Sequence, residues 1–212
     1  MKNEGLQAKQ TDAIVKIAII ILAAGQSSRM GTANKLLEPV QGKPMLRHAL
    51  DAAIESKASA IIVVTGFEAK QIDALLKGLP VAVVHNPFYA QGISSSLRCG
   101  IAALPADIDG VVICLADMPG VGACHIDKLI EAFDPQRNRA ICVSSFGGRR
   151  GNPVLWSRLF FNEMQQLSGD AGARQLMQLH AALIHAVDMP SDAVLRDIDT
   201  PDALADLNRR YR

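Results

Sequence analysis

A short stretch near the start of the chain, LAAGQSSRMGTANK at residues 22–35, gathers glycines, hydroxyls and two cations at close spacing. Gly25 permits close approach of the backbone, and Ser28 adds a hydroxyl donor. Arg29 offers a planar fork for phosphate oxygens, while Lys35 offers a mobile point charge. Because a glycine-rich turn also presents backbone N–H groups to anions, the stretch is typical of a loop that holds a polyphosphate.

The glycine spacing separates this loop from two common nucleotide-binding motifs. A Walker loop has four residues between its glycines and a Lys-Ser/Thr pair directly afterwards. Here five residues separate Gly25 from Gly31, and Thr32 follows. The stretch does not read GxGxxG either, so neither a P-loop kinase nor a dinucleotide-binding enzyme is indicated. The alternative is a flexible surface loop with solvated charges. The apolar run before the stretch and the two cations within the stretch disfavour this alternative.

Two aspartates are candidate metal ligands. Asp117 ends an apolar run and begins an Asp-Met-Pro sequence that forces an extended turn. If the run is a strand of an open α/β sheet, Asp117 lies at the edge where such sheets bind ligands. Mg²⁺ prefers one or two protein oxygens with phosphate oxygens and water, so Asp117 serves either a metal or simply the turn. Asp199, in DIDTP, serves the same metal, or it or Thr200 caps the helix that follows.

The composition restricts the class of partner. The 212 residues carry 22 basic and 21 acidic side chains, so no broad positive surface for nucleic acid or an anionic membrane is indicated. The length suits one core, which predicts a flexible polar leader over residues 1–13 and a single domain over 14–212. Acidic residues in the leader and the shortness of the next apolar run argue against a secretory signal or a membrane span. We therefore expect a cytoplasmic protein.

Cysteine and histidine spacing indicates no metal or redox motif. The four cysteines form no CxxC pair, and the five histidines form no HExxH pattern. We expect reduced, buried thiols at Cys99, Cys114, Cys124 and Cys142.

The segments that must position these residues alternate in character. The Ile-rich run at residues 16–24 is typical of a strand buried on both faces of a parallel sheet. Amphipathic stretches and further apolar runs follow in alternation, which predicts an α/β three-layer sandwich: a Rossmann-like, mostly parallel sheet with helices on both faces. The expected strands are 16–24, 60–66, 81–85, 110–119, 140–146 and 184–189, and the expected helices are 44–56, 69–78, 93–104, 125–133, 157–167, 173–183 and 200–211.

Seven segments in a fixed order carry a resemblance to a known family. They are LAAGQSSRMGTANKLL (22–37), VVTG (63–66), HNPFYAQGISSS (85–96), LADMP (115–119), RRGNPV (149–154), SGDAGAR (168–174) and DIDTPDAL (197–204). Each is weak alone, but together they resemble the nucleotidyltransferases that activate molybdopterin, over about residues 17–207. Within that family the chain is most similar to the members that transfer a cytidylyl group.

The resemblance implies a reaction and a set of site residues. The reaction is transfer of CMP from CTP to the terminal phosphate of molybdopterin or the molybdenum cofactor, with Mg²⁺ and release of pyrophosphate. Arg29, Lys35 and Asp117 would be catalytic, and Asp117 and Asp199 would hold the metal. The N-terminal half would bind the nucleotide through Leu22, Ala23, Ala24, Gly25, Ser28, Arg29, Lys35, Thr65, Gly66, Asn86, Gly92 and Ser95. The C-terminal half would bind the acceptor through Arg150, Gly151, Asn152, Pro153, Gly169, Asp170 and Arg174.

The residues themselves agree with this reading at two points. Glycines beside Arg149, Arg150 and Arg174 fit an anionic partner, although solvated surface charge is the alternative. An acceptor phosphate monoester has a second pKa of about 6 and is mostly ionised near pH 7, so the reaction needs no general base. Apart from this reading, Ser94 or Ser95 is expected to cap the helix at whose start they stand.

Several alternatives stay open. Members of the family that transfer a guanylyl group tend to carry Gly-Gly where this chain has Ala24-Gly25, so the Ala24 methyl favours CTP over GTP only modestly. Transferases that use sugar phosphates or methylerythritol phosphate share the loop and the fold. A non-catalytic protein that binds and delivers the molybdenum cofactor is a third class. Transient contact with a recipient molybdoenzyme or its maturation factor is compatible with each molybdopterin-based reading.

Overall fold

A computed structural model describes residues 15–26, 34–170 and 172–210 of the chain. Its centre is a seven-stranded sheet with the strand order β5-β4-β1-β6-β8-β7-β9. Neighbouring strands are parallel except where β8 pairs antiparallel with β6 and with β7, which confirms the predicted mostly parallel sheet. The strands are β1 (Ile17–Ala23), β4 (Ala60–Thr65), β5 (Ala82–His85), β6 (Gly110–Leu115), β7 (Ile141–Phe146), β8 (Arg149–Ser157) and β9 (Ile184–Asp188), with a separate antiparallel pair of β2 (Pro39–Val40) and β3 (Lys43–Pro44).

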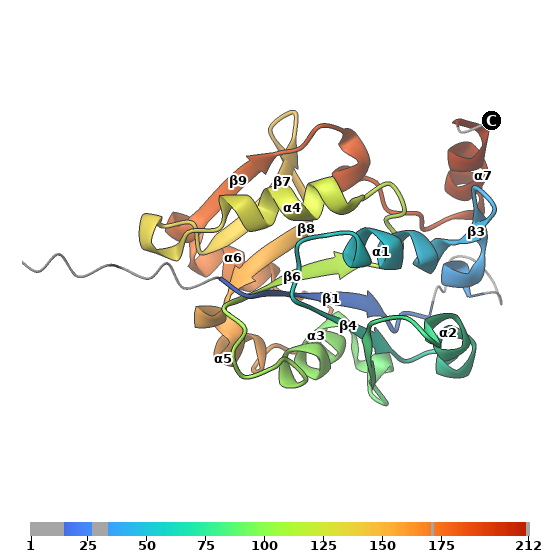
Figure 1. The fold of residues 1–212 in the computed structure, drawn as a ribbon, viewed down its shortest axis with the longest axis horizontal. Helices are drawn as coiled ribbons and strands as arrows, with labels where there is room; N and C mark the ends of the chain where they lie inside the picture. The colour runs from blue at the N-terminus through green and yellow to red at the C-terminus, as the bar shows by residue number, and fades with distance from the viewer. Residues whose placement is uncertain (1–14, 27–33, 171, 211–212) are drawn as a thin grey trace, which may run out of the picture.

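Helices cover both faces of the sheet, as predicted (Figure 1). The described α-helices are α1 (Met45–Ile54), α2 (Ala69–Leu76), α3 (Ile93–Ala102), α4 (Ala123–Ala132), α5 (Phe161–Met164), α6 (Arg174–Leu179) and α7 (Pro201–Arg210). Short 3-10 helices are η1 (Lys35–Leu37), η2 (Tyr89–Gln91), η3 (Pro135–Arg137), η4 (Arg158–Phe160), η5 (Ala181–Leu183) and η6 (Asp192–Leu195).

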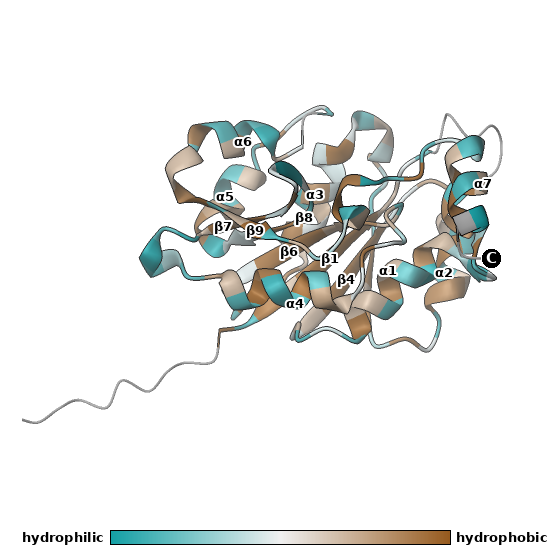
Figure 2. Ribbon diagram, turned by 90° about the horizontal axis from the view of Figure 1, so that it is seen from above, coloured by the Kyte–Doolittle hydropathy of each residue, from teal (hydrophilic) through white to brown (hydrophobic). Residues whose placement is uncertain are grey.

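The alternation of side chains along β1 divides the interior into two cores. Ile19 and Ile21 belong to the core beneath α1, α2 and α4, whereas Ala18 and Ile20 belong to the core beneath α3, α5 and α6. All four side chains are fully buried, as expected for a central strand of a parallel sheet that is covered on both faces. Figure 2 shows the brown apolar strands between these two layers of helices.

The strand directions bring the predicted motifs to one edge of the sheet. Six parallel strands end at this edge, and β8 begins there. The segments that follow β1, β4, β5 and β6, the turn before β8, and the segment after β9 therefore lie around a common rim. This is the edge at which open α/β sheets bind their ligands.

The sequence reading missed β8, which it treated only as a site segment. Gly151 and Pro153 disfavour a central strand. The register explains how they are tolerated: β8 pairs with β6 only from Val154 onward, and its ladder with β7 is irregular between Val143 and Ser145. Residues 149–153 therefore lack a partner strand on the β6 side, and the sheet opens between the end of β6 and the start of β8.

Candidate active site

Lys35 lies at the centre of the predicted catalytic group. Its Nζ atom donates to Asp117 Oδ2 at 2.7 Å and to Asp199 Oδ1 at 2.6 Å. Asn34 accepts the Leu36 N–H through its own side chain and so caps η1, while the buried Leu36 anchors this short helix. The fold therefore joins three residues that the sequence placed in three separate motifs.

The two aspartates are held together by the backbone as well as by the lysine. Met118 is buried, and its N–H donates to the Leu115 carbonyl, which turns the chain after β6. The Ile198 N–H then donates to the Asp117 carbonyl at 2.9 Å. The neighbouring Asp199 is thereby carried to the same site from the segment between η6 and α7.

The alternative role of Asp199 as a helix cap is filled by its neighbour. The Thr200 hydroxyl oxygen accepts the Ala203 N–H at 3.2 Å, as a capping side chain does at the start of a helix. The Asp199 carboxylate instead contacts Lys35.

The charges of the site are partly withdrawn from solvent. The side chains of Lys35, Asp117 and Asp199 are 11%, 20% and 35% exposed. Burial alone would lower the pKa of Lys35, but the two carboxylates outweigh it and raise that pKa above its usual value of 10.5. Lys35 is therefore a fixed cation at every physiological pH.

The carboxylates fit a hard divalent cation. Asp117 Oδ1 is buried and has no hydrogen-bond partner among the described residues. A buried carboxylate oxygen that lacks a partner is costly, and a metal ligand bond would satisfy it. Asp117 with Asp199 would supply the one or two protein oxygens that Mg²⁺ takes alongside phosphate and water. A cluster of three or more His, Cys, Asp or Glu side chains suited to a metal is not found in the described part of the chain.

The predicted nucleotide residues lie around the ends of β1, β4 and β5. Thr65 ends β4, and its buried Oγ1 lacks a partner within the described residues. Asn86 donates to the Ser95 and Ser96 hydroxyls, and its carbonyl oxygen accepts the Phe88 N–H. Asn86 and Ser95 are buried and bonded to one another, so they brace the turn between β5 and α3. Ser28 and Arg29 lie outside the described residues.

The expected serine cap of α3 is wrong. Ser94, Ser95 and Ser96 lie within the helix, whose N-cap is Gly92 without a side-chain hydrogen bond. The Ser95 hydroxyl donates to the Gly92 carbonyl instead. The buried Ser94 hydroxyl has no partner in the part of the chain that the structure describes.

Gly92 joins the nucleotide and acceptor motifs. Its φ of +98° is strained for residues with a side chain, and a Cβ there would lie 2.3 Å from Asp170 Oδ1 and 2.7 Å from the Gly169 backbone. The Ser94 N–H donates to the Gly169 carbonyl at 3.2 Å. The SGDAGAR segment therefore rests directly on the first turn of α3, where only glycine fits.

A cavity of about 580 Å³ opens where β6 and β8 separate. Its apolar lining includes Leu22 and Leu115 at the ends of β1 and β6, together with Trp156. Five of the seven predicted acceptor residues line it: Arg150, Gly151, Asn152, Asp170 and Arg174. Pro153 and Gly169 do not line it, although each adjoins a residue that does. Arg150, Asp170 and Arg174 are exposed, so the cavity has an apolar floor and a charged rim.

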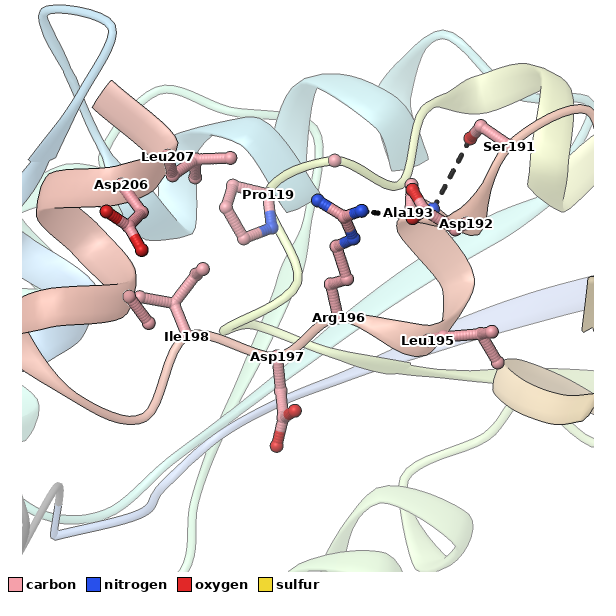
Figure 3. A pocket seen from close by; sticks show the side chains of 12 residues that line it. Pro119, Ser191, Asp192, Ala193, Leu195, Arg196, Asp197, Ile198, Asp206 and Leu207 are labelled. Carbon is pink, nitrogen blue, oxygen red and sulfur yellow. Dashed lines mark hydrogen bonds and ion pairs between the residues drawn. The ribbon is translucent and has the colours of Figure 1, made fainter. Parts of the chain in front are cut away.

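A second cavity, of about 620 Å³, lies between η6, α7 and the turn after Asp117 (Figure 3). Pro119, Leu195, Ile198 and Leu207 give it apolar walls, and Arg196 forms an ion pair with Asp192 beside it. None of the predicted site residues lines it. The smaller cavity, which begins at the ends of β1 and β6, is therefore the better candidate for the acceptor.

Some functional features were invisible to sequence motifs. The apolar floor comes from Ile113, Val143, Val154 and Trp156 on three adjacent strands. The short apolar run Val154-Leu155-Trp156 is the signal that could have identified β8 and its contribution to this floor. The expectation of four buried thiols holds for two of them. Cys114 and Cys142 are buried, and burial raises the pKa of each thiol to about 12. Cys99 is half-buried and Cys124 is exposed.

The comparisons with known proteins agree with this architecture. The model of the MobA-like NTP transferase domain matches residues 19–187. The chain belongs to this family. It is 29% identical to the molybdenum cofactor cytidylyltransferase of Escherichia coli K12, over 92% of this chain and 97% of that protein. It is also 27% identical to nicotine blue oxidoreductase of Paenarthrobacter nicotinovorans, over 87% and 93% of the two chains. MobA-like proteins of similar length thus carry different activities in their names.

Solved structures share the whole fold. Rv0371c of Mycobacterium tuberculosis H37Rv superposes with a TM-score of 0.81 at 26% identity, covering 93% of this chain and all of that one. A manganese complex of Rv0371c matches with a TM-score of 0.73 at 28% identity, over 92% and 99% of the two chains. The chain is therefore a nucleotidyltransferase of the MobA-like family, and a relative with the same fold has been crystallised with a divalent metal.

Of the helices in the described residues, none has both the length and the apolar composition needed to cross a lipid bilayer.

Proposed function

We propose that this MobA-like protein transfers CMP from CTP to the terminal phosphate of molybdopterin or the molybdenum cofactor, with Mg²⁺, and releases pyrophosphate. The observation that carries the proposal is the Lys35-Asp117-Asp199 cluster beside an apolar cavity with arginines at its rim. The cluster suits a metal and a triphosphate. The cavity suits an acceptor with a flat ring system, whose faces apolar side chains can cover, and an anion at its end.

The nucleotide would lie along the ends of β1, β4 and β5. Lys35 would contact phosphate oxygens, and Arg29 would add a second cation from the loop. Asp117 and Asp199 would hold Mg²⁺, which supplies charge neutralisation at the α-phosphate and the departing pyrophosphate. Thr65 would offer its buried hydroxyl to the base or ribose.

The acceptor would enter the cavity between β6 and β8. Trp156 and its neighbours would cover the ring system, since apolar and aromatic walls with a few polar groups are typical of small-molecule sites. Arg150 and Arg174 would hold the terminal phosphate at the rim. Leu22 and Leu115 line the cavity and lie at the ends of β1 and β6, so the acceptor phosphate would face the α-phosphate.

The chemistry is a displacement at phosphorus. One oxygen of the acceptor phosphate forms a bond to the α-phosphorus of CTP as the bond to the bridging β-phosphate oxygen breaks, and pyrophosphate leaves. The attacking phosphate is mostly ionised near neutral pH because its second pKa is about 6, so no side chain must remove a proton. The residues around it act by positioning and by charge.

The choice of base is the finest part of the proposal. Ala24 is buried, and its methyl carbon lies 2.8 Å from the position that a Cβ on Gly66 would take. The methyl therefore fills part of the space between the end of β1 and the end of β4. This would leave less room there for a purine than for a pyrimidine.

Pyrophosphate release tests the proposal directly. Purified protein would be mixed with Mg²⁺, molybdopterin and either CTP or GTP, and pyrophosphate would be measured over time. We expect faster release with CTP. Faster release with GTP would reassign the nucleotide, and release only with methylerythritol phosphate or a sugar phosphate would reassign the acceptor.

Asp117→Asn separates catalysis from binding in the same assay. Loss of a carboxylate that would hold the metal, whose charge stabilises the reacting phosphates, should lower kcat by roughly 100-fold or more. Asp127→Asn, on α4, where the half-buried carboxylate accepts the Lys57 N–H before β4 at the opposite edge of the sheet, provides the matched control and should leave the rate unchanged. Tight cofactor binding by the unaltered protein without any pyrophosphate release would instead favour a delivery protein.

A further inference from the structure

The ammonium group of Lys35 occupies the place between the two candidate metal ligands. It lies within 2.7 Å of an oxygen from each aspartate, and these are its two ion-pair partners in the described residues. A divalent cation shared by Asp117 and Asp199 would need oxygen contacts of roughly 2.1 Å on the same two side chains. Even if the metal took the unpartnered Oδ1 of Asp117, it would lie beside the Lys35 ammonium group, so the two positive charges compete for the same pair of carboxylates.

The charges make this competition dependent on the nucleotide. Two partly buried carboxylates need nearby positive charge, and the Lys35 ammonium group contributes it to both. A metal ion that arrives alone must displace the ammonium group and leave it beside a dication. A triphosphate offers the displaced ammonium group new oxygens, so both cations then have anionic partners.

The local structure allows the side chain to move while its backbone stays. Leu36 is buried, and the Asn34 cap fixes the first turn of η1. The ammonium group lies at the end of a flexible four-carbon stem. The exchange thus requires rotation about side-chain bonds and no displacement of the sheet edge.

We propose that Lys35 excludes free divalent metal from the site and releases the two aspartates only when a nucleoside triphosphate takes over its ammonium group. The proposal rests on the assignment of Asp117 and Asp199 as metal ligands in the proposed function. It adds an order of binding: the metal enters with the nucleotide. Lys35 acts first as a placeholder for the metal and then as a ligand for phosphate.

Binding of Mn²⁺ without any acceptor tests this order. The free ion would be followed by electron paramagnetic resonance during titration of the full chain, first without nucleotide and then with CTP or GTP. When the metal site is open in only a fraction of the molecules, its apparent affinity for metal is reduced by that fraction. We therefore expect Lys35→Met, which cannot close the site with an ammonium group, to bind Mn²⁺ alone about tenfold more tightly than the unaltered protein. The same variant should bind the triphosphate more weakly.

Three further variants keep the test decisive. Lys35→Gln removes the charge but retains a donor for the carboxylates, so it replaces Lys35→Met if that variant does not fold. Lys35→Arg retains a cation and should continue to exclude free Mn²⁺. Lys57 is an exposed lysine that lies before β4, at the opposite edge of the sheet, and pairs with Glu131. Lys57→Met should leave Mn²⁺ binding unchanged.

The outcomes distinguish this proposal from the proposed function. Equal affinity for free Mn²⁺ in the unaltered protein and in folded Lys35→Met or Lys35→Gln would overturn the exclusion, whatever the enzyme's substrates are. No Mn²⁺ binding with either nucleotide would overturn the metal assignment and the exclusion together. Tighter Mn²⁺ binding by the neutral variants, together with no pyrophosphate release from CTP and molybdopterin, would support the exclusion while rejecting the proposed function.

Discussion

Two alanine methyl groups at the end of β1 lie where the two cores meet the candidate site. Ala23 faces the core beneath α1, and Ala24 faces the core beneath α3. Each is almost fully buried, so each methyl contributes to packing. Only Ala24 packs beside Gly66, at the predicted nucleotide site.

Replacement of Ala24 by glycine should therefore change the choice of base. A buried methyl is worth about 1 kcal/mol, so we expect the ratio of kcat/KM for CTP over GTP to fall about fivefold in Ala24→Gly. Steady-state pyrophosphate release with each nucleotide measures the ratio. Ala18→Gly removes a buried methyl from the same core near the start of β1, far from the site, and should lower stability without moving the ratio. A ratio that falls equally in both variants would reject the role of Ala24.

Much of the candidate site could be proposed from residue types, but the partners of several side chains could not be predicted. Lys35 and Asp117 stand in recognisable motifs beside apolar runs. Asn86 and Ser95 also stand in a motif, yet the fold bonds them to one another. Such pairing depends on the turn that brings positions nine residues apart into contact, and no local pattern specifies that turn.

At the scale of elements, the junction of η2 and α3 links the two halves of the site. Gly92 permits the SGDAGAR segment to lie against the first turn of α3. The nucleotide residues before α3 and the acceptor residues before α6 thus share one backbone contact. A change at this contact should affect both substrates.

Gly92→Ala should raise KM for nucleotide and acceptor together. Its Cβ would displace Asp170, and a positive φ adds a conformational cost of about 1 kcal/mol or more for a residue with a side chain. Gly78→Ala is the matched control, because Gly78 also has a positive φ, of +81°, but open space around it. The control should lower the free energy of unfolding without changing either KM. A similar KM change in both variants would show that general destabilisation, and not the contact with Asp170, is responsible.

His125 connects two other elements that support the site. Its Nδ1 accepts the Gly122 N–H at 3.1 Å, and its Nε2 lies 3.2 Å from the Ser191 hydroxyl, just before η6. Burial lowers the pKa of His125 below its usual value of 6.5, and the charge of Lys128 adds to the effect. The neutral imidazole therefore joins the start of α4 to the segment that carries Asp199.

Stability should consequently fall as the pH drops below 6.5. The unfolded chain takes up a proton at His125 near pH 6.5, whereas the folded chain resists protonation until a lower pH, so acid favours unfolding in that window. Urea unfolding at pH 7.5, 6 and 5 measures the slope of the free energy of unfolding against pH. His125→Asn should make it shallower, while replacement of the exposed His85 by asparagine should leave it as it was. An unchanged slope in His125→Asn would exclude this histidine as the cause.

The sequence predicts elements best where they are regular. The parallel strands were predicted from uninterrupted apolar runs, which is the pattern of strands covered on both faces. β8 was missed because Gly151 and Pro153 interrupt it, and they are tolerated only where the ladder to β6 has ended. The same interruption opens the acceptor cavity, so the least predictable strand forms part of the candidate site.

At the scale of the whole molecule, the site joins parts of the chain that are far apart in sequence. Lys35 contacts Asp117 across 82 positions and Asp199 across 164. The alternation of apolar and amphipathic segments predicts an α/β sheet, but not the order of its strands. That order, with β1 beside β6, places Lys35 next to Asp117, and the contact between Ile198 and Asp117 then adds Asp199.

Because the residues of the candidate site come from distant parts of the chain, nucleotide binding should stabilise the fold as a unit. Ligand at 100 times its Kd adds about 2.7 kcal/mol to the free energy of unfolding. For a protein of this size that corresponds to a rise in Tm of about 5–10 °C. We expect this rise with CTP and Mg²⁺ together and little rise with Mg²⁺ alone, since Lys35 holds both aspartates. Excess EDTA or Asp117→Asn should remove most of it, and a full rise that survives both would mean that the nucleotide binds without the metal site.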